Sequence, residues 1–120
     1  MSRKRRRDDV LYAGLLRLME EKRLYLRKHL TRDEVARELM TNRTYVTRAL
    51  KGRGLNFSQF VNAFRVQHAI GLLFDEHFRD VPPADIAEMS GFATVDTMNR
   101  YVKKSAGSTA CAMRIRVLKD

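Results

Sequence analysis

Several residue types that build other classes of protein are scarce in this chain of 120 residues. Its single cysteine, Cys111, excludes an intrachain disulfide and a zinc site made of several cysteines. Two prolines and six glycines exclude collagen-like and low-complexity sequence. The longest apolar run, residues 66–74, contains Gln67 and His68 and is far shorter than the roughly 20 residues of a membrane span. We therefore expect a folded intracellular domain.

Charge is the most informative part of the composition. Basic residues outnumber acidic ones by 24 to 14, and the net charge of +10 is uneven: +6 in residues 1–30, +3 in 31–56, −1 in 57–81 and +2 in 82–120. Residues 39–74 and 97–119 contain no acidic residue. A generic surface interleaves both signs, so these stretches favour a polyanionic partner. Nucleic acid fits better than a membrane, because the basic residues do not lie opposite one broad apolar face.

Helical signals recur along the chain, whereas strand signals are nearly absent, so we predict an all-α fold of about seven helices. Asp8 and Asp9 are suited to start the first helix, and Thr31 to Glu34 form a capping box for the second. Asn42 is a good N-cap for a third helix. Further helices are expected at 57–74, from 84 to about 89, from about 94 to 104, and after Thr109.

The second and third helices are echoed by the fifth and sixth. Val35-Ala36 matches Ile86-Ala87 at an offset of 51, and the Arg-x-x-Lys that begins at Arg48 recurs at an offset of 52. Each unit therefore pairs a short helix containing a small alanine with a basic helix across a tight turn. That is the layout of a helix-turn-helix, so the sequence predicts two such units and DNA binding.

Residues 8–117 resemble the DNA-binding domain of AraC/XylS-type transcriptional regulators. The resemblance rests on Leu30-Thr31-Arg32-Asp33-Glu34-Val35-Ala36, the 42–51 helix, Phe57-Ser58-Gln59-Phe60-Val61-Asn62, Arg65, Ile70, Leu73, Ile86-Ala87-Glu88, Gly91-Phe92, Arg100, Lys103-Lys104, Gly107-Ser108-Thr109 and Arg114. It implies helix-turn-helix subdomains at 8–56 and 75–120 joined by a linker helix at 57–74. The basic start (residues 1–7), with Arg3 to Arg7, has three readings: a flexible arm that reaches phosphate or the minor groove, a solvated linker remnant, or a juxtamembrane boundary.

Four residues depart from the family pattern, all in the second unit. The family usually has an aromatic residue where Met98 lies, Phe at Val102, Pro at Ala110 and Tyr at Met113. These departures leave the expected fold intact and bear on how the second unit binds.

The resemblance also implies which side chains would contact DNA. The recognition helices, about 42–51 and 94–104, would enter adjacent major grooves, with the linker helix spanning roughly 26 Å. The residues expected to face bases are Thr44, Thr47, Arg48, Val95, Asp96, Asn99 and Arg100. Those expected at phosphates or base edges are Asn42, Arg43, Lys51, Thr94, Lys103 and Lys104. We expect two DNA boxes about one helical turn apart, or one strong box if the second unit is degenerate.

The expected partner is double-stranded DNA, with RNA polymerase and an N-terminal sensor domain as further candidates. The spacing of His29, His68 and His77 fits no zinc hydrolase, and we expect no enzyme, no cofactor, no metal and no membrane contact by this segment. The alternative function is a helix-turn-helix-derived module that contacts another regulator or RNA polymerase. The expected location is the cytoplasm, on the nucleoid, and a membrane-anchored parent protein stays open.

Overall fold

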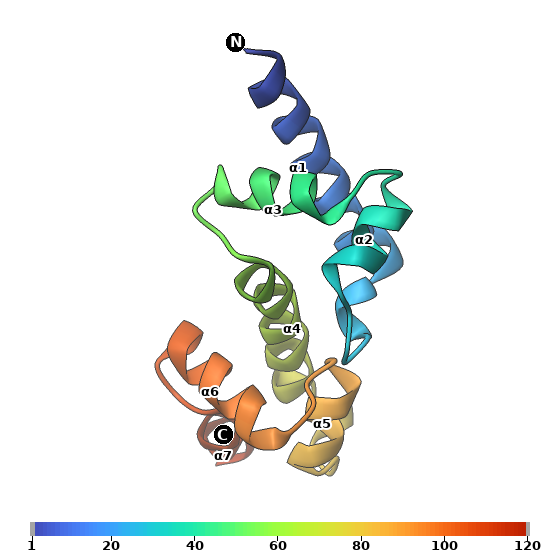
Figure 1. Cartoon of the computed structure of the whole chain (residues 1–120). Helices are drawn as coiled ribbons and strands as arrows, with labels where there is room; N and C mark the ends of the chain where they lie inside the picture. The colour runs from blue at the N-terminus through green and yellow to red at the C-terminus, as the bar shows by residue number, and fades with distance from the viewer. Residues whose placement is uncertain (1, 120) are drawn as a thin grey trace. The chain divides into compact units, whose positions relative to one another are not determined.

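A computed structural model describes residues 2–119, with side chains as far as Ile115. In that range it contains no strand but seven α-helices and two short 3-10 helices, η1 (Leu24–Leu26) after α1 and η2 (Glu76–Phe78) after α4 (Figure 1). The α-helices are α1 (Arg3–Lys22), α2 (Arg32–Glu38), α3 (Arg43–Lys51), α4 (Phe57–Phe74), α5 (Pro83–Met89), α6 (Val95–Ala106) and α7 (Ala110–Lys119). The predicted all-α class is confirmed. The chain forms two compact units, unit 1 (Met1–Val61) and unit 2 (Asn62–Asp120), and α4 runs from one into the other.

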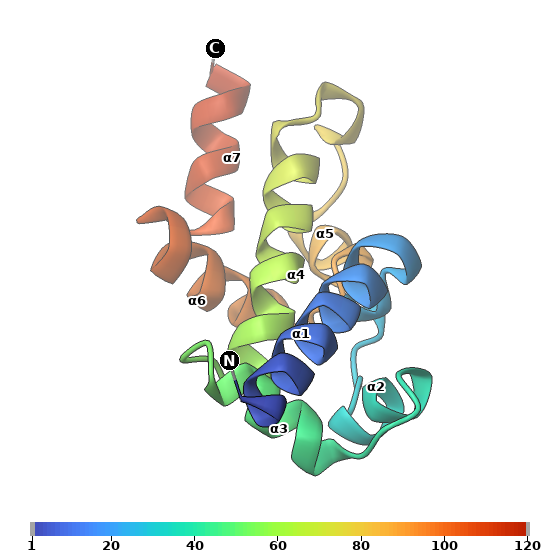
Figure 2. The same ribbon diagram turned by 90° about the horizontal axis from the view of Figure 1, so that it is seen from above.

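In unit 1, α3 packs against both α1 and α2 (Figure 2). Leu15 and Met19 of α1, Val35 of α2 and Leu50 of α3 are fully buried. Gly14 lets α1 approach the end of α2 closely, since a Cβ at that position would lie 2.9 Å from the Leu39 Cδ2 atom. The apolar positions at helical spacing in the sequence therefore face one core.

Side-chain caps fix several helix starts in unit 1. The Thr31 hydroxyl accepts from the Glu34 amide at 3.2 Å, and Glu34 Oε1 accepts from the Thr31 amide at 3.3 Å, which confirms the capping box. Asn42 Oδ1 accepts from the amide of Tyr45 at 3.1 Å and caps α3. Asn56 caps α4 in the same way, accepting from the Gln59 amide at 2.8 Å. These interactions span three residues, which is why the sequence predicts them.

The first helix begins earlier than the sequence predicts. α1 starts at Arg3 rather than at Asp8, because the Ser2 hydroxyl accepts from the Arg5 amide at 3.1 Å and acts as the N-cap. The basic segment 3–7, read from the sequence as an arm or linker remnant, is therefore helical. α6 likewise continues to Ala106, beyond its predicted end at Lys104.

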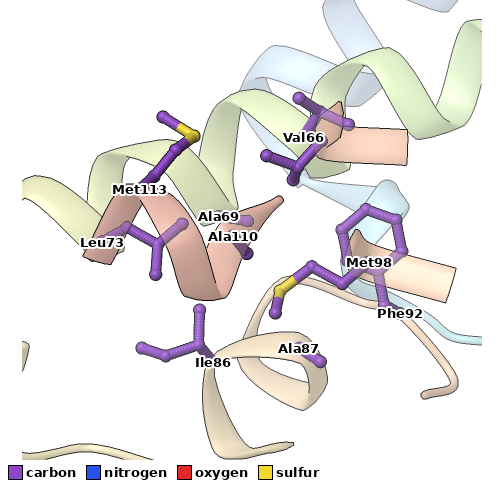
Figure 3. Packing of buried hydrophobic residues seen from close by; sticks show 10 residues of the cluster. Val66, Ala69, Leu73, Ile86, Ala87, Phe92, Met98, Ala110 and Met113 are labelled. Carbon is purple, nitrogen blue, oxygen red and sulfur yellow. The ribbon is translucent and has the colours of Figure 1, made fainter. Parts of the chain in front are cut away.

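Unit 2 has its own hydrophobic core, built from α4, α5, α6 and α7 (Figure 3). Its members are Val66, Ala69, Leu73, Ile86, Ala87, Phe92, Met98, Val102, Ala110 and Met113. All four departures from the family pattern are among them. Arg114 is buried beside this core and donates to the backbone carbonyls of Phe78 and Val81, which ties α7 to the segment after α4. The departures therefore change the packing of the core and not the exposed surface.

Candidate nucleic-acid interface

The turn between α2 and α3 repeats between α5 and α6 in its hydrogen bonds. The Thr41 amide donates to the Ala36 carbonyl at 2.9 Å, and the Phe92 amide donates to the Ala87 carbonyl at the same distance. The residues before these amides, Met40 and Gly91, both have positive φ, 56° and 86°. The second turn then holds one more residue before its helix, as the change of offset predicts. The internal repeat is thus two helix-turn-helix units.

The α3 helix is buried on one face and exposed on the other. Val46, Ala49 and Leu50 are at most 1% exposed and fix the helix in the core of unit 1. The opposite face carries exposed polar and basic side chains, with Arg48 half-buried beside them. The predicted contact residues that share this surface are Asn42, Arg43, Thr44, Thr47, Arg48 and Lys51. A helix held this way can present its outer face to a groove.

Guanidinium groups from two other helices border this surface. The Arg7 guanidinium of α1 lies 4.8 Å from the centroid of the Tyr45 ring, and Arg48 lies 5.6 Å from the same centroid. The Arg32 guanidinium of α2 donates to the Thr47 hydroxyl at 3.0 Å. Successive helical residues are rotated by about 100°, so Tyr45 and Thr47 lie on opposite edges of the exposed face. The basic surface therefore extends from α3 onto both neighbouring helices.

The residues directly after α3 contact α1. Arg53 pairs with Asp9 at 3.1 Å, and its guanidinium lies 4.3 Å from the centroid of the Tyr12 ring. A pocket of about 650 Å³ lies beside this pair, lined by Arg5, Asp8, Asp9, Ala49, Gly52 and Arg53. Asp9 and Tyr12 therefore hold Arg53 against α1, away from the exposed face of α3.

In unit 2, α6 exposes a smaller set of polar side chains. Met98 and Val102 are fully buried, whereas the predicted contacts Thr94, Asp96, Arg100, Lys103 and Lys104 are exposed. The Thr94 hydroxyl caps the helix by accepting from the Thr97 amide at 3.1 Å. Asp96 lies in the first turn, where the helix dipole favours a negative charge.

Two predicted base contacts of unit 2 are turned toward the protein. Asn99 Oδ1 accepts from the Cys111 amide at 3.4 Å, and Asn99 Nδ2 lies 3.7 Å from Cys111 Sγ, so Asn99 contacts the first turn of α7. Val95 is half-buried against the core of unit 2. The structure therefore brings Asp96 and Arg100 together on the open surface of α6 without Val95 and Asn99.

Sequence reasoning did not name Arg32 as a contact, and it read Arg7 only as part of a basic arm able to reach phosphate, without placing it beside α3. Both lie outside the two predicted recognition helices, and their partners are distant along the chain. The run of basic residues at the start of the sequence was a usable signal for Arg7. No sequence pattern near Arg32 indicates that its side chain reaches α3.

The described residues contain neither a metal site nor a membrane-spanning helix. No group of three or more His, Cys, Asp or Glu side chains among residues 2–119 is placed to hold a metal ion. No helix in the described part of the chain is long and apolar enough to cross a membrane.

Comparison with known families decides the identity of this fold. Residues 35–116, about two thirds of the chain, match a family described as a helix-turn-helix domain. The chain belongs to this family. Its curated relatives and structural neighbours include regulatory proteins, in agreement with the resemblance to AraC-type transcriptional regulators.

One curated relative of this helix-turn-helix chain is the TCP pilus virulence regulatory protein of Vibrio cholerae serotype O1. The two are 26% identical over 102 residues, which cover 82% of this chain and 36% of the relative. The same protein from a second strain of that organism matches equally. The chain thus spans about a third of the length of these curated relatives.

Solved structures share the fold of this helix-turn-helix chain. The C-terminal domain of the two-component response regulator yesN from Fusobacterium nucleatum has a TM-score of 0.71 at 22% identity, covering 86% of this chain and 96% of that domain. The C-terminal domain of AraT, a response regulator from Geobacillus stearothermophilus, has a TM-score of 0.72 at 22% identity, with coverages of 89% and 84%. A DNA-binding transcriptional dual regulator from Escherichia coli K-12 has 0.65 at 18% identity, with coverages of 97% and 99%.

Proposed function

We propose that this domain binds double-stranded DNA in a sequence-specific manner and places α3 in a major groove. The observation that carries the proposal is the surface of α3. Its apolar face is fixed in the core of unit 1, while its outer face is polar, basic and bordered by further guanidinium groups. An exposed helix with cations along both edges fits a groove lined by phosphates.

Within α3, the roles follow from side-chain chemistry. Arg48 is the strongest candidate for reading a base, because a guanidinium pairs with the O6 and N7 acceptors of guanine. Thr44 and Thr47 would read base edges or thymine methyl groups, with Arg32 holding the Thr47 hydroxyl. Arg43 and Lys51 are exposed at the two ends of the helix and would bind phosphates, with Asn42 beside them.

The α6 helix would read a second box. Arg100 is exposed and is the candidate for guanine, and Asp96 would accept from cytosine. Thr94, Lys103 and Lys104 would bind phosphates. Val95 and Asn99 would contact bases only if they left their positions against the protein, which lowers the expected contribution of this unit. We therefore propose an asymmetric site with a strong box for α3 and a weaker one for α6.

Selection of bound sequences from a random duplex pool at near-physiological salt tests the proposal. Two enriched boxes about one helical turn apart would support base reading by both units. One box would assign base reading to α3 and leave α6 with backbone contacts. Absence of any enrichment would overturn the proposal and bring forward the alternative, a module that contacts another regulator or RNA polymerase.

A matched pair of variants connects the selected box to α3. Arg48→Ala is expected to relax the preference at one guanine, whereas Arg17→Ala removes an exposed arginine of α1 that pairs with Glu21. Equal sequence preferences in both variants would count against Arg48 as a reader of bases.

We also propose that the domain acts as the output module of a larger regulator with a sensor domain. The support comes from the two solved neighbours that are C-terminal domains of response regulators and from the greater length of the curated relatives. Contact with RNA polymerase stays a prediction.

A further inference from the structure

The first turns of α1 hold five consecutive basic residues, Arg3–Arg7, at the N-terminal end of a helix. The positive end of the helix dipole and repulsion between neighbouring cations both disfavour this arrangement. The first turn contains no acidic residue that would offset it. All five side chains are exposed, and within residues 2–119 no ion pair joins any of them to a carboxylate. An anionic partner would stabilise such a segment.

The position of this segment in unit 1 indicates which anion it meets. The Arg7 guanidinium lies over the Tyr45 ring of α3, and that ring also contacts Arg48. Arg3 precedes Arg7 by four residues and so lies on the same face of α1. Arg3 and Arg7 therefore continue the basic edge of α3 along α1.

We propose that Arg3 and Arg7 bind backbone phosphates of the same duplex whose bases α3 reads. This inference rests on the proposed function, and it adds a part of the interface that does not depend on base sequence. Anionic lipids offer similar phosphate chemistry, but a helix that lies in a membrane interface needs apolar side chains beside its charges. Residues 3–9 contain none. The continuity with α3 and this absence favour duplex DNA.

The test measures the affinity of the full chain for two duplexes over a series of salt concentrations, by fluorescence anisotropy. One duplex carries the selected box and the other a scrambled sequence. Arg3→Gln combined with Arg7→Gln is expected to reduce the slope of log affinity against log salt by about 1.8, since each phosphate contact contributes about 0.9. Affinity for both duplexes should fall roughly three- to tenfold, while their ratio stays unchanged.

Two controls separate this result from a general effect of charge or folding. Arg17→Gln removes an exposed arginine from the same helix and should leave the slope unchanged. The double variant should unfold at about the same temperature as the original chain, because the loss of the Arg7 contact with Tyr45 is offset by the removal of cations from the positive end of a helix. An affinity loss that comes with an unchanged salt slope or with a changed ratio between the two duplexes would contradict the inference.

The remaining outcomes distinguish the two proposals. An unchanged slope in the double variant, with normal binding by the original chain, would overturn the role of Arg3 and Arg7 and leave the proposed function standing. No salt-dependent binding by the original chain would overturn both. If the double variant lost binding to phosphatidylserine vesicles but kept its duplex binding, the partner of this segment would be a membrane.

Discussion

The two units share a backbone motif but differ in charge. Unit 1 contains 16 basic and seven acidic residues, a net charge of +9, whereas unit 2 contains eight and seven, a net charge of +1. Their turns carry matching hydrogen bonds and their second helices both begin with a side-chain cap. The helix-turn-helix backbone is thus independent of the electrostatic surface that it carries. Since phosphate contacts dominate the affinity of most DNA-binding proteins, unit 1 is expected to supply most of the binding free energy.

The edges of α3 and α6 differ as well. Arg32 of α2 donates to Thr47 at the edge of α3, but the position that corresponds to Arg32 in α5 is Pro83, which has no side-chain donor. The residue that corresponds to Thr47 is Asn99, whose side-chain oxygen accepts a hydrogen bond from the first turn of α7. Thr47 itself is exposed on α3. In unit 2, α7 therefore holds against the protein a side chain that we predicted as a DNA contact.

The largest expected effect concerns the separate cores. Leu50→Ala in unit 1 and Met98→Ala in unit 2 each remove a fully buried side chain, and each should reduce the free energy of unfolding by about 2–5 kcal/mol. If each core stabilises mainly its own unit, Leu50→Ala will expose amides of α2 and α3 to hydrogen exchange while α5 and α6 stay protected. Met98→Ala should give the reverse pattern. Loss of protection throughout the chain in both variants would show that the units unfold together.

The next largest effect is on base discrimination by Arg48 and Arg100, which lie at equivalent positions of α3 and α6. Arg48→Ala should cost about 1–3 kcal/mol of discrimination at one guanine, because it would remove the bidentate contact that we propose for this arginine. Arg100→Ala should cost less discrimination. The neighbouring Asn99 is held by α7, so fewer side chains beside Arg100 are placed to contact bases with it. Affinities for the selected duplex and for single-base variants of it measure both costs. A larger loss for Arg100→Ala would reverse the ranking of the two units.

Sequence reasoning predicted the local parts of this fold and not the contacts between helices. The starts of α2, α3 and α4 follow from caps that span three residues, and the internal repeat follows from two shifted patterns of side chains. The direction of Asn99 depends on α7, which the sequence does not place beside it. The helical state of residues 3–7 was missed because five adjacent cations are unfavourable at a helix start, and a serine cap outside the run sets its beginning. The surface of the site was therefore the least predictable part.

A smaller effect is expected in the two turns. Met40 adopts a φ of 56°, a region that costs a residue with a side chain roughly 1 kcal/mol, and Gly91 adopts 86° without that cost. Met40→Gly should therefore raise the free energy of unfolding by about 0.5–1 kcal/mol, as its side chain is 95% exposed and packs against little. Gly91→Ala should lower it by about the same amount or more. Chemical denaturation measures both, and destabilisation by Met40→Gly would show that the exposed side chain has contacts that matter.

The smallest effects concern one carboxylate in each unit, and their causes differ. The hydrogen bond from Lys22, 2.7 Å away, lowers the pKa of Glu38, whereas the backbone amide of His77 is the largest cause of the lowered pKa of Asp75. Because both values are depressed, the stabilisation is present above the ordinary carboxyl range and is lost as the pH falls through the folded-state value. Side-chain carbon shifts followed by NMR against pH measure the two pKa values. Lys22→Gln should return the pKa of Glu38 toward its ordinary value, and added salt should do so in part, since both groups are exposed.

His77→Ala keeps the backbone amide, so the pKa of Asp75 should stay below its ordinary value. A full return of Asp75 in that variant would assign its shift to the imidazole and make the two carboxylates alike.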